Sequence, residues 1–105
     1  MKVEFLWFSG CPNHETARNM LLAVLDESRI YAEFEDIDAT DPAAAAELRF
    51  PGSPTIRVNG LDIEPDFADP GDYTPRCRLY ATDQGLHGLP KREWIAAALK
   101  RAMMP

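Results

Sequence analysis

An apolar strand pattern that changes abruptly into an amphipathic helix pattern constrains the fold of this chain more than any other feature. Residues 3–8 are apolar or aromatic except for Glu4, a composition that suits a buried strand. The residues that follow carry one apolar face at helical spacing, formed by Ala17, Met20, Leu21, Val24 and Leu25. We therefore expect a strand over residues 2–8 and a helix over residues 12–27.

The junction between these two elements contains a cysteine. Cys11 is followed by Pro12, whose fixed backbone angle suits the first turn of a helix and whose missing N–H would be unpaired there. Cys11 is thus predicted to lie at the positive end of the helix dipole, where a thiolate is favoured over a thiol. This position makes Cys11 a candidate nucleophile.

Proline, glycine and asparagine mark the bounds of the remaining elements. Asn59-Gly60, between two stretches that alternate apolar and polar residues, is typical of a two-residue hairpin turn. The expected elements are a strand over residues 32–38, a helix over 43–49, strands over 55–58 and 61–64, and a helix over 91–103. The order β-α-β-α-β-β-α predicts an α/β fold, and 105 residues suit one domain that spans residues 1–105.

The charge of the chain argues against two classes of partner. Acidic residues outnumber basic ones 17 to 11 and the net charge is −6, with no cluster of lysine and arginine. Nucleic acid and anionic membranes are therefore not expected partners. No apolar run reaches the ~20 residues that cross a bilayer, and the apolar N-terminal run holds Glu4 and lacks a small-residue cleavage site. With two cysteines, the chain suits a reducing cytoplasm.

The order of elements, with a cysteine at the start of the first helix, resembles the thioredoxin-like superfamily in its smaller, glutaredoxin-like form. Ser53-Pro54-Thr55 stands immediately before the third expected strand, where that family carries a cis-proline facing the cysteine. The resemblance implies a four-stranded mixed sheet. It also implies that the exposed backbone beside Pro54 pairs with a substrate, with Pro12, Ser53, Pro54 and Thr55 as substrate-binding residues.

The chain departs from the family at the second position of its redox motif. Redox-active members carry Cys-x-x-Cys, in which the second thiol resolves the mixed disulfide formed by the first. Here the motif is Cys11-Pro12-Asn13-His14. A protonated His14 would stabilise a Cys11 thiolate, whereas a neutral His14 would accept the thiol proton or bind a metal. The alternative interpretation is an exposed histidine of the first helical turn without a role.

Cys77 is the other thiol that is able to resolve Cys11. It lies in residues 65–89, a proline- and glycine-rich connection that is unusually long for a compact domain. In the fold that the resemblance implies, this extended loop precedes the last helix near the active-site cysteine, so it is able to bring Cys77 over Cys11. Arg76 and Arg78 flank the thiol, and we expect their charges to lower the pKa of Cys77.

A wider set of motifs resembles a group of short bacterial thioredoxin-like proteins, some of which carry the label alkylmercury lyase. The motifs occupy residues 8–13, 52–60, 77–80 and 85–88. Organomercurial lyases use two cysteines and an aspartate that protonates the leaving carbon. This chain has two cysteines, and Asp66, Asp69 and Asp72 precede Cys77.

Three functions of different classes remain open. The first is a thiol–disulfide oxidoreductase with Cys11, His14 and Cys77 as catalytic residues, no bound cofactor, and protein or low-molecular-weight thiols such as glutathione as partners. The second is a soft-metal protein that binds mercury, zinc or copper through Cys11, Cys77 and His14, with organomercurial handling as one form. The third is a redox-inactive interaction module. The environment of Cys11 favours the first, and the oligomeric state stays open.

Overall fold

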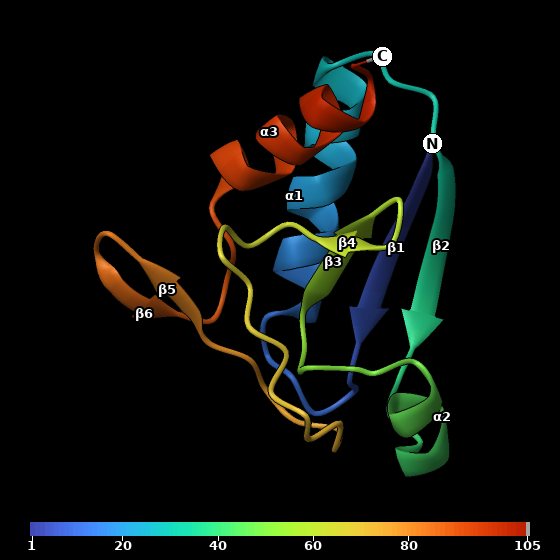
Figure 1. Ribbon diagram of the computed structural model, residues 1–105, viewed down its shortest axis with the longest axis vertical. Coiled ribbons are helices and arrows are strands. Elements are labelled where there is room, and N and C mark those ends of the chain that lie inside the picture. The colour runs from blue at the N-terminus through green and yellow to red at the C-terminus, as the bar shows by residue number, and fades with distance from the viewer. Residues whose placement is uncertain (105) are drawn as a thin grey trace.

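A four-stranded mixed sheet forms the centre of the molecule in the computed structural model, which describes residues 1–104 (Figure 1). Its strands lie in the order β2-β1-β3-β4 and span Glu33–Asp38, Lys2–Trp7, Thr55–Val58 and Leu61–Asp62 respectively. β1 runs parallel to β2 and antiparallel to β3, and β3 pairs with β4 through the predicted hairpin. The prediction of an α/β fold with a four-stranded mixed sheet is confirmed.

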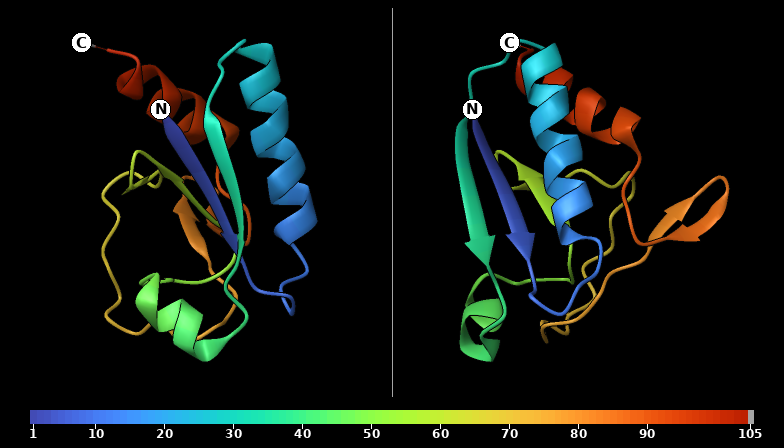
Figure 2. Two further views of the ribbon diagram at one scale, coloured as in Figure 1. Left: turned by 90° about the vertical axis from the view of Figure 1, so that its right-hand side faces the viewer. Right: turned by 180° about the vertical axis from the view of Figure 1, so that it is seen from behind.

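The described residues form three helices: α1 (His14–Glu27), α2 (Pro42–Glu47), which lies beyond the ends of β1 and β2 (Figure 1), and α3 (Arg92–Ala102). α1 and α3 lie side by side and share one core with the sheet, as Figure 2 shows from two further sides. Because side chains alternate along a strand, Val3 and Phe5 of β1 belong to this core. Leu6 belongs to a second, smaller core with residues of the α2 region.

The first helix begins later than the sequence predicts. Pro12 lies in a turn before α1, where the N–H of Cys11 donates to the carbonyl of Phe8 at 2.9 Å. Asn13 is the N-cap, and His14 is the first helical residue. The second helix shows the expected start, because Pro42 occupies its first turn and the Asp41 carboxylate accepts the Ala44 N–H at 3.0 Å.

The connection between β4 and α3 contains a hairpin that the sequence interpretation left as irregular chain. β5 (Tyr80–Thr82) pairs with β6 (Gly85–His87) in an antiparallel two-stranded sheet that projects away from the main sheet (Figure 1). Before this hairpin, the chain crosses beside the loop that follows β1. Within residues 1–104, no helix has the length and apolar character required to cross a membrane.

Candidate functional site

Cys11 lies in the loop between β1 and α1, almost completely enclosed by the protein. Its side chain is 3% exposed. The Sγ atom accepts the N–H of Asn13 at 3.4 Å and donates to the carbonyl oxygen of Ser53 at 3.4 Å. Since Asn13 caps α1, the sulfur does lie at the N-terminal end of this helix, as predicted. Pro12, a predicted substrate-binding residue, is exposed beside it.

The Ser53–Pro54 peptide bond is cis, which confirms the prediction from the sequence. Ser53 and Pro54 are fully buried and stand immediately before β3. The carbonyl that accepts the Cys11 thiol therefore belongs to this cis peptide unit. The Ser53 hydroxyl is buried and finds no hydrogen-bond partner among residues 1–104.

The backbone of Ser53, which the resemblance assigns to a substrate, binds the protein's own chain in this structure. Its N–H donates to the carbonyl of Arg76 at 2.8 Å, and its carbonyl accepts the N–H of Arg78 at 2.9 Å. The two bonds form a parallel bridge between Ser53 and Cys77. Residues 76–78, which we call the Cys77 segment, therefore occupy the edge that the resemblance assigns to a substrate.

Pro54 and Thr55, two further predicted substrate-binding residues, also bind the protein's own chain. The hydroxyl of buried Thr55 donates to the carbonyl of Gly52 at 2.6 Å and accepts from Arg78 at 2.9 Å. The carbonyl of Pro54 accepts the hydroxyl of buried Tyr80. All three residues from Ser53 to Thr55 thus bind the protein's own chain.

The bridge brings Cys77 next to Ser53, whose carbonyl also accepts the Cys11 thiol at 3.4 Å. Both cysteines are free among the described residues, with Cys11 buried and Cys77 exposed. Loss of hydration, followed by the charge and the hydrogen bond of the neighbouring Cys11 thiol, raises the pKa of Cys77. This direction is opposite to the one that the flanking arginines predicted.

The arginines fail to lower the pKa of Cys77 because their charges are engaged elsewhere. Arg76 binds the carboxylate of Asp72 at 3.2 Å. Arg78 is buried, and its guanidinium binds Asp62 and Glu64. The sequence shows that arginines flank Cys77, but it does not show which groups they contact.

Arg78 anchors the Cys77 segment to the sheet through a buried ionic cluster that sequence reasoning missed. Its guanidinium donates two hydrogen bonds to Asp62, at 2.7 and 2.9 Å, and one to Glu64 at 3.1 Å. The side chains of Arg78 and Asp62 are only 6% and 4% exposed. Burial disfavours the guanidinium charge, but the two carboxylates outweigh burial and raise the pKa of Arg78.

Gly52 allows the Cys77 segment to approach this closely. Its φ of +132° lies in a region that residues with a Cβ rarely adopt. A Cβ at this position would lie 2.9 Å from the Cβ of Arg78 and 3.3 Å from the carbonyl oxygen of Cys77. The sequence places this glycine directly before Ser53-Pro54, but it does not show that another segment packs against it.

The imidazole ring of His14 contacts the indole ring of Trp7. The two rings stack with centroids 4.8 Å apart and an interplanar angle of 16°. Trp7 in turn donates its indole N–H to Asp36 at 2.6 Å. The Nδ1 atom of His14 is buried without a hydrogen-bond partner within the described chain. The side chain therefore packs against β1, and the structure provides no hydrogen bond through which it would act on Cys11.

The three side chains of the metal alternative do not gather into a metal site. Within residues 1–104, no group of three histidine, cysteine, aspartate or glutamate side chains is placed to hold a metal ion. Cys11 and Cys77 lie together as a pair, and His14 is not brought to them as a third ligand.

The acids that precede Cys77 stabilise their own loop. Asp69 accepts hydrogen bonds from three groups: the Gly71 N–H, the Tyr73 hydroxyl and the Arg49 guanidinium. These bonds lower the pKa of Asp69 to about 2. Asp72 binds Thr74 and Arg76, whereas Asp66 is exposed. With its pKa so low, Asp69 is ionised at neutral pH and has no proton to donate there.

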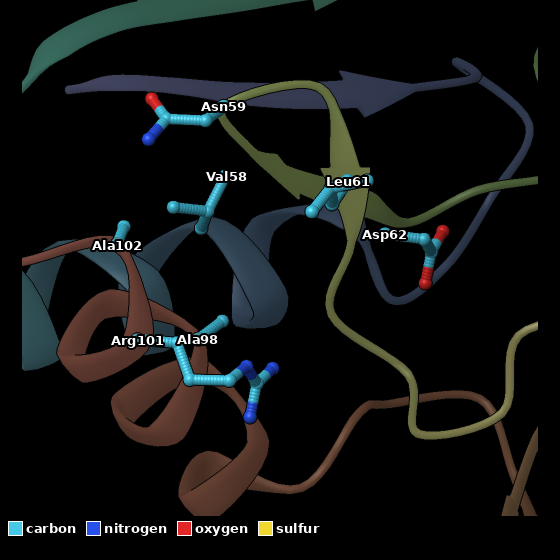
Figure 3. A pocket seen from close by; sticks show the side chains of 7 residues that line it. All are labelled: Val58, Asn59, Leu61, Asp62, Ala98, Arg101 and Ala102. Carbon is cyan, nitrogen blue, oxygen red and sulfur yellow. The ribbon is translucent and has the colours of Figure 1, made fainter. Parts of the chain in front are cut away.

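Two cavities differ in their relation to the thiols. One of about 180 Å³ lies between the β3–β4 hairpin and α3, and Figure 3 shows its lining, with Asp62 at one end and Arg101 at the other. Neither cysteine is among the described residues that line it. A second, shallower cavity of about 270 Å³ includes Cys77, Phe67 and Leu79 in its wall.

Comparisons of the chain with family models, with curated proteins and with solved structures find no match. The functional assignment therefore rests on the geometry of the two thiols and on the segment that carries Cys77.

Proposed function

We propose that this protein is a thiol–disulfide exchange protein with a thioredoxin-like fold, in which Cys11 and Cys77 form a reversible dithiol–disulfide pair. The observation that carries the proposal is the bridge between Ser53 and Cys77, because the Ser53 carbonyl also accepts the Cys11 thiol, so that both cysteines contact the same residue. Cys77 thereby supplies the second thiol that a Cys-x-x-Cys motif would carry. His14 stands at that second position and has no part in the exchange.

The surroundings of Cys11 support chemistry at its sulfur. The N–H of Asn13 points at the sulfur and would stabilise a thiolate that forms there. The carbonyl of Ser53 accepts a hydrogen bond from the thiol form. The site therefore has a partner for each protonation state of Cys11, which suits a sulfur that alternates between thiol, thiolate and disulfide.

The experiment is intact-mass measurement of the protein before and after mild oxidation with glutathione disulfide. We expect the wild type to lose the mass of two hydrogen atoms and to regain it with a reductant. A peptide map under non-reducing conditions should join the peptides of Cys11 and Cys77. The variants Cys11→Ser and Cys77→Ser are the controls, and neither is expected to lose that mass. A wild type that forms no internal disulfide would refute the proposal.

A second candidate function follows from the same pair of sulfurs. Two thiolates side by side are a ligand set that soft metal ions such as Cu⁺ and Hg²⁺ accept. Metal binding that displaces protons from both cysteines in the reduced wild type, and that is lost in each single variant, would support this candidate. A protein that binds such a metal tightly and fails to form the internal disulfide would favour metal binding over exchange.

A further inference from the structure

We propose that exchange begins at Cys77, and that its external partner is a low-molecular-weight thiol or disulfide rather than an extended polypeptide. This inference rests on the proposed function, because it names the sulfur and the substrate class of that same pair. It reverses the order of attack that the sequence predicts, in which Cys11 acts first. Three features carry it: the access of solvent to the sulfurs, the Ser53 backbone groups that already bind the Cys77 segment, and a cavity beside Cys77.

Access separates the two sulfurs clearly. Cys77 is exposed, whereas Cys11 is 3% exposed. In thiol–disulfide exchange the incoming group must reach a sulfur, so access decides which sulfur is attacked. An external thiol or disulfide therefore meets Cys77. Cys11 reacts only with a sulfur that is already held beside it.

The Ser53 edge is closed to a polypeptide. An extended peptide binds an exposed strand edge through free N–H and carbonyl groups. At Ser53 both groups already bind the Cys77 segment, at 2.8 and 2.9 Å. To free them, the protein would also have to break the contacts of Arg78 with Asp62 and Glu64.

A cavity beside Cys77 has the size of a small ligand. It measures about 270 Å³, close to the lower bound of ~300 Å³ typical of small-molecule sites. Its wall is mostly polar, with Glu64 and Arg76 among its residues, and Phe67 and Leu79 add apolar surface. The cavity gives a small disulfide room to approach the Cys77 sulfur without displacing the Cys77 segment.

The Cys77 thiol first gives its proton to solvent. The Cys77 thiolate attacks a small disulfide RSSR, a Cys77–S–S–R bond forms, and RS⁻ leaves and takes a proton from water. Cys11, after it loses its proton to solvent, then attacks the Cys77 sulfur and expels the second RS⁻. The protein dithiol is oxidised by two electrons and the external disulfide is reduced to two thiols. In reverse, RS⁻ attacks Cys77 and Cys11 leaves as a thiolate that accepts the Asn13 N–H.

The test compares the two single-cysteine variants with a neutral probe, hydroxyethyl disulfide, by the initial rate of adduct formation in intact mass. Cys11→Ser leaves Cys77 alone, and Cys77→Ser leaves Cys11 alone. We expect the first to form its adduct at least about tenfold faster, because its sulfur is reachable. Equal rates, or a faster Cys77→Ser variant, would overturn the order of attack.

A denatured control and a peptide probe complete the test. In denaturant the two variants should react at similar rates, and a difference that persists there would show that the fold does not cause it. A mixed disulfide of the same thiol with an extended peptide should react more slowly with Cys11→Ser than the small probe does. A peptide probe that reacts as fast as the small one would overturn the substrate class.

Failure of this inference and failure of the proposed function give different experimental results. If the proposed function is wrong, the wild type forms no internal disulfide, whichever single variant forms its adduct faster. If only this inference is wrong, the wild type forms a reversible disulfide, but Cys11 reacts faster than Cys77 with the external probe. Thermal unfolding of both variants, measured alongside, shows that each rate belongs to folded protein.

Discussion

The two thiols lie close together but are held in place by different forces. Cys11 follows β1, whose residues Val3 and Phe5 lie in the apolar core that the sheet forms with α1 and α3. The Cys77 segment is held by backbone bonds to Ser53 and by the buried charges around Arg78. One cysteine of the pair therefore depends on hydrophobic burial of the strand before it, and the other depends on polar contacts. Polar substitutions should therefore separate the thiols while the sheet remains folded.

The largest effect should come from Arg78→Met, which leaves Asp62 buried without its partner. Breaking one side of a buried ion pair costs about 3–5 kcal/mol, so the free energy of unfolding should fall by about that amount. Denaturant unfolding measures it. Internal disulfide formation should also slow, because the Cys77 segment loses its anchor.

Two controls sharpen this prediction. Arg76→Met removes an exposed ion pair from the neighbouring arginine and should change the stability little. Adding Asp62→Asn to Arg78→Met neutralises the stranded carboxylate and should recover part of the loss. If the two arginine variants are equally stable, the ionic cluster does not anchor the Cys77 segment.

Tyr80→Phe should give the next largest effect. The Tyr80 hydroxyl donates to the carbonyl of Pro54, and both groups are buried. Its removal leaves that carbonyl without the bond, at a cost of about 1–3 kcal/mol. Thermal unfolding of the variant measures this cost. A variant as stable as the wild type would show that the bond contributes nothing to the attachment of the segment.

The difference between the two regions also explains what the sequence could predict. The strand and helix of the N-terminal part and the Asn59-Gly60 hairpin follow from local periodicity and turn chemistry, so their positions were predictable within a few residues. The cis bond before Pro54 was predictable because it belongs to the resemblance. The late start of α1 at His14 was not, because the turn at Cys11 depends on the Phe8 carbonyl.

For the position of the Cys77 segment, the sequence supported only a hypothesis. Its proline and glycine content indicated an irregular connection, whereas its attachment depends on partners far apart in the sequence. Arg78 meets Asp62, and Cys77 meets Ser53, through contacts that no local pattern encodes. The expected effect of the arginines on the pKa of Cys77 had the wrong sign for the same reason.

The raised pKa of Cys77 predicts a pH dependence that links the two thiols. A raised pKa means that Cys77 stays protonated, and so unreactive, to a higher pH than an ordinary thiol. Besides loss of hydration, Cys11 contributes to this shift. In Cys11→Ser the alkylation rate of Cys77 should therefore rise at a lower pH than in the wild type. Iodoacetamide labelling against pH, followed by peptide mass, measures both curves, and coincident curves would contradict the contact between the thiols.

The smallest effect on exchange should come from His14→Ala. Because the His14 ring stacks on Trp7, its loss should cost about 0.5–1.5 kcal/mol of stability. The rate of internal disulfide formation should change by less than about twofold, since transfer of the proton from Cys11 does not use this ring. A fall of about tenfold or more in that rate, in a folded variant, would show that His14 takes part in the exchange.

The most direct test of the account is the equilibrium of the wild type with glutathione buffers of increasing oxidising strength, read by intact mass and peptide mapping. We predict one reversible transition from dithiol to the Cys11–Cys77 disulfide, with two glutathione molecules released for each glutathione disulfide consumed. A protein that instead accumulates separate glutathione adducts on Cys11 and Cys77, without a bond between them, would contradict the account.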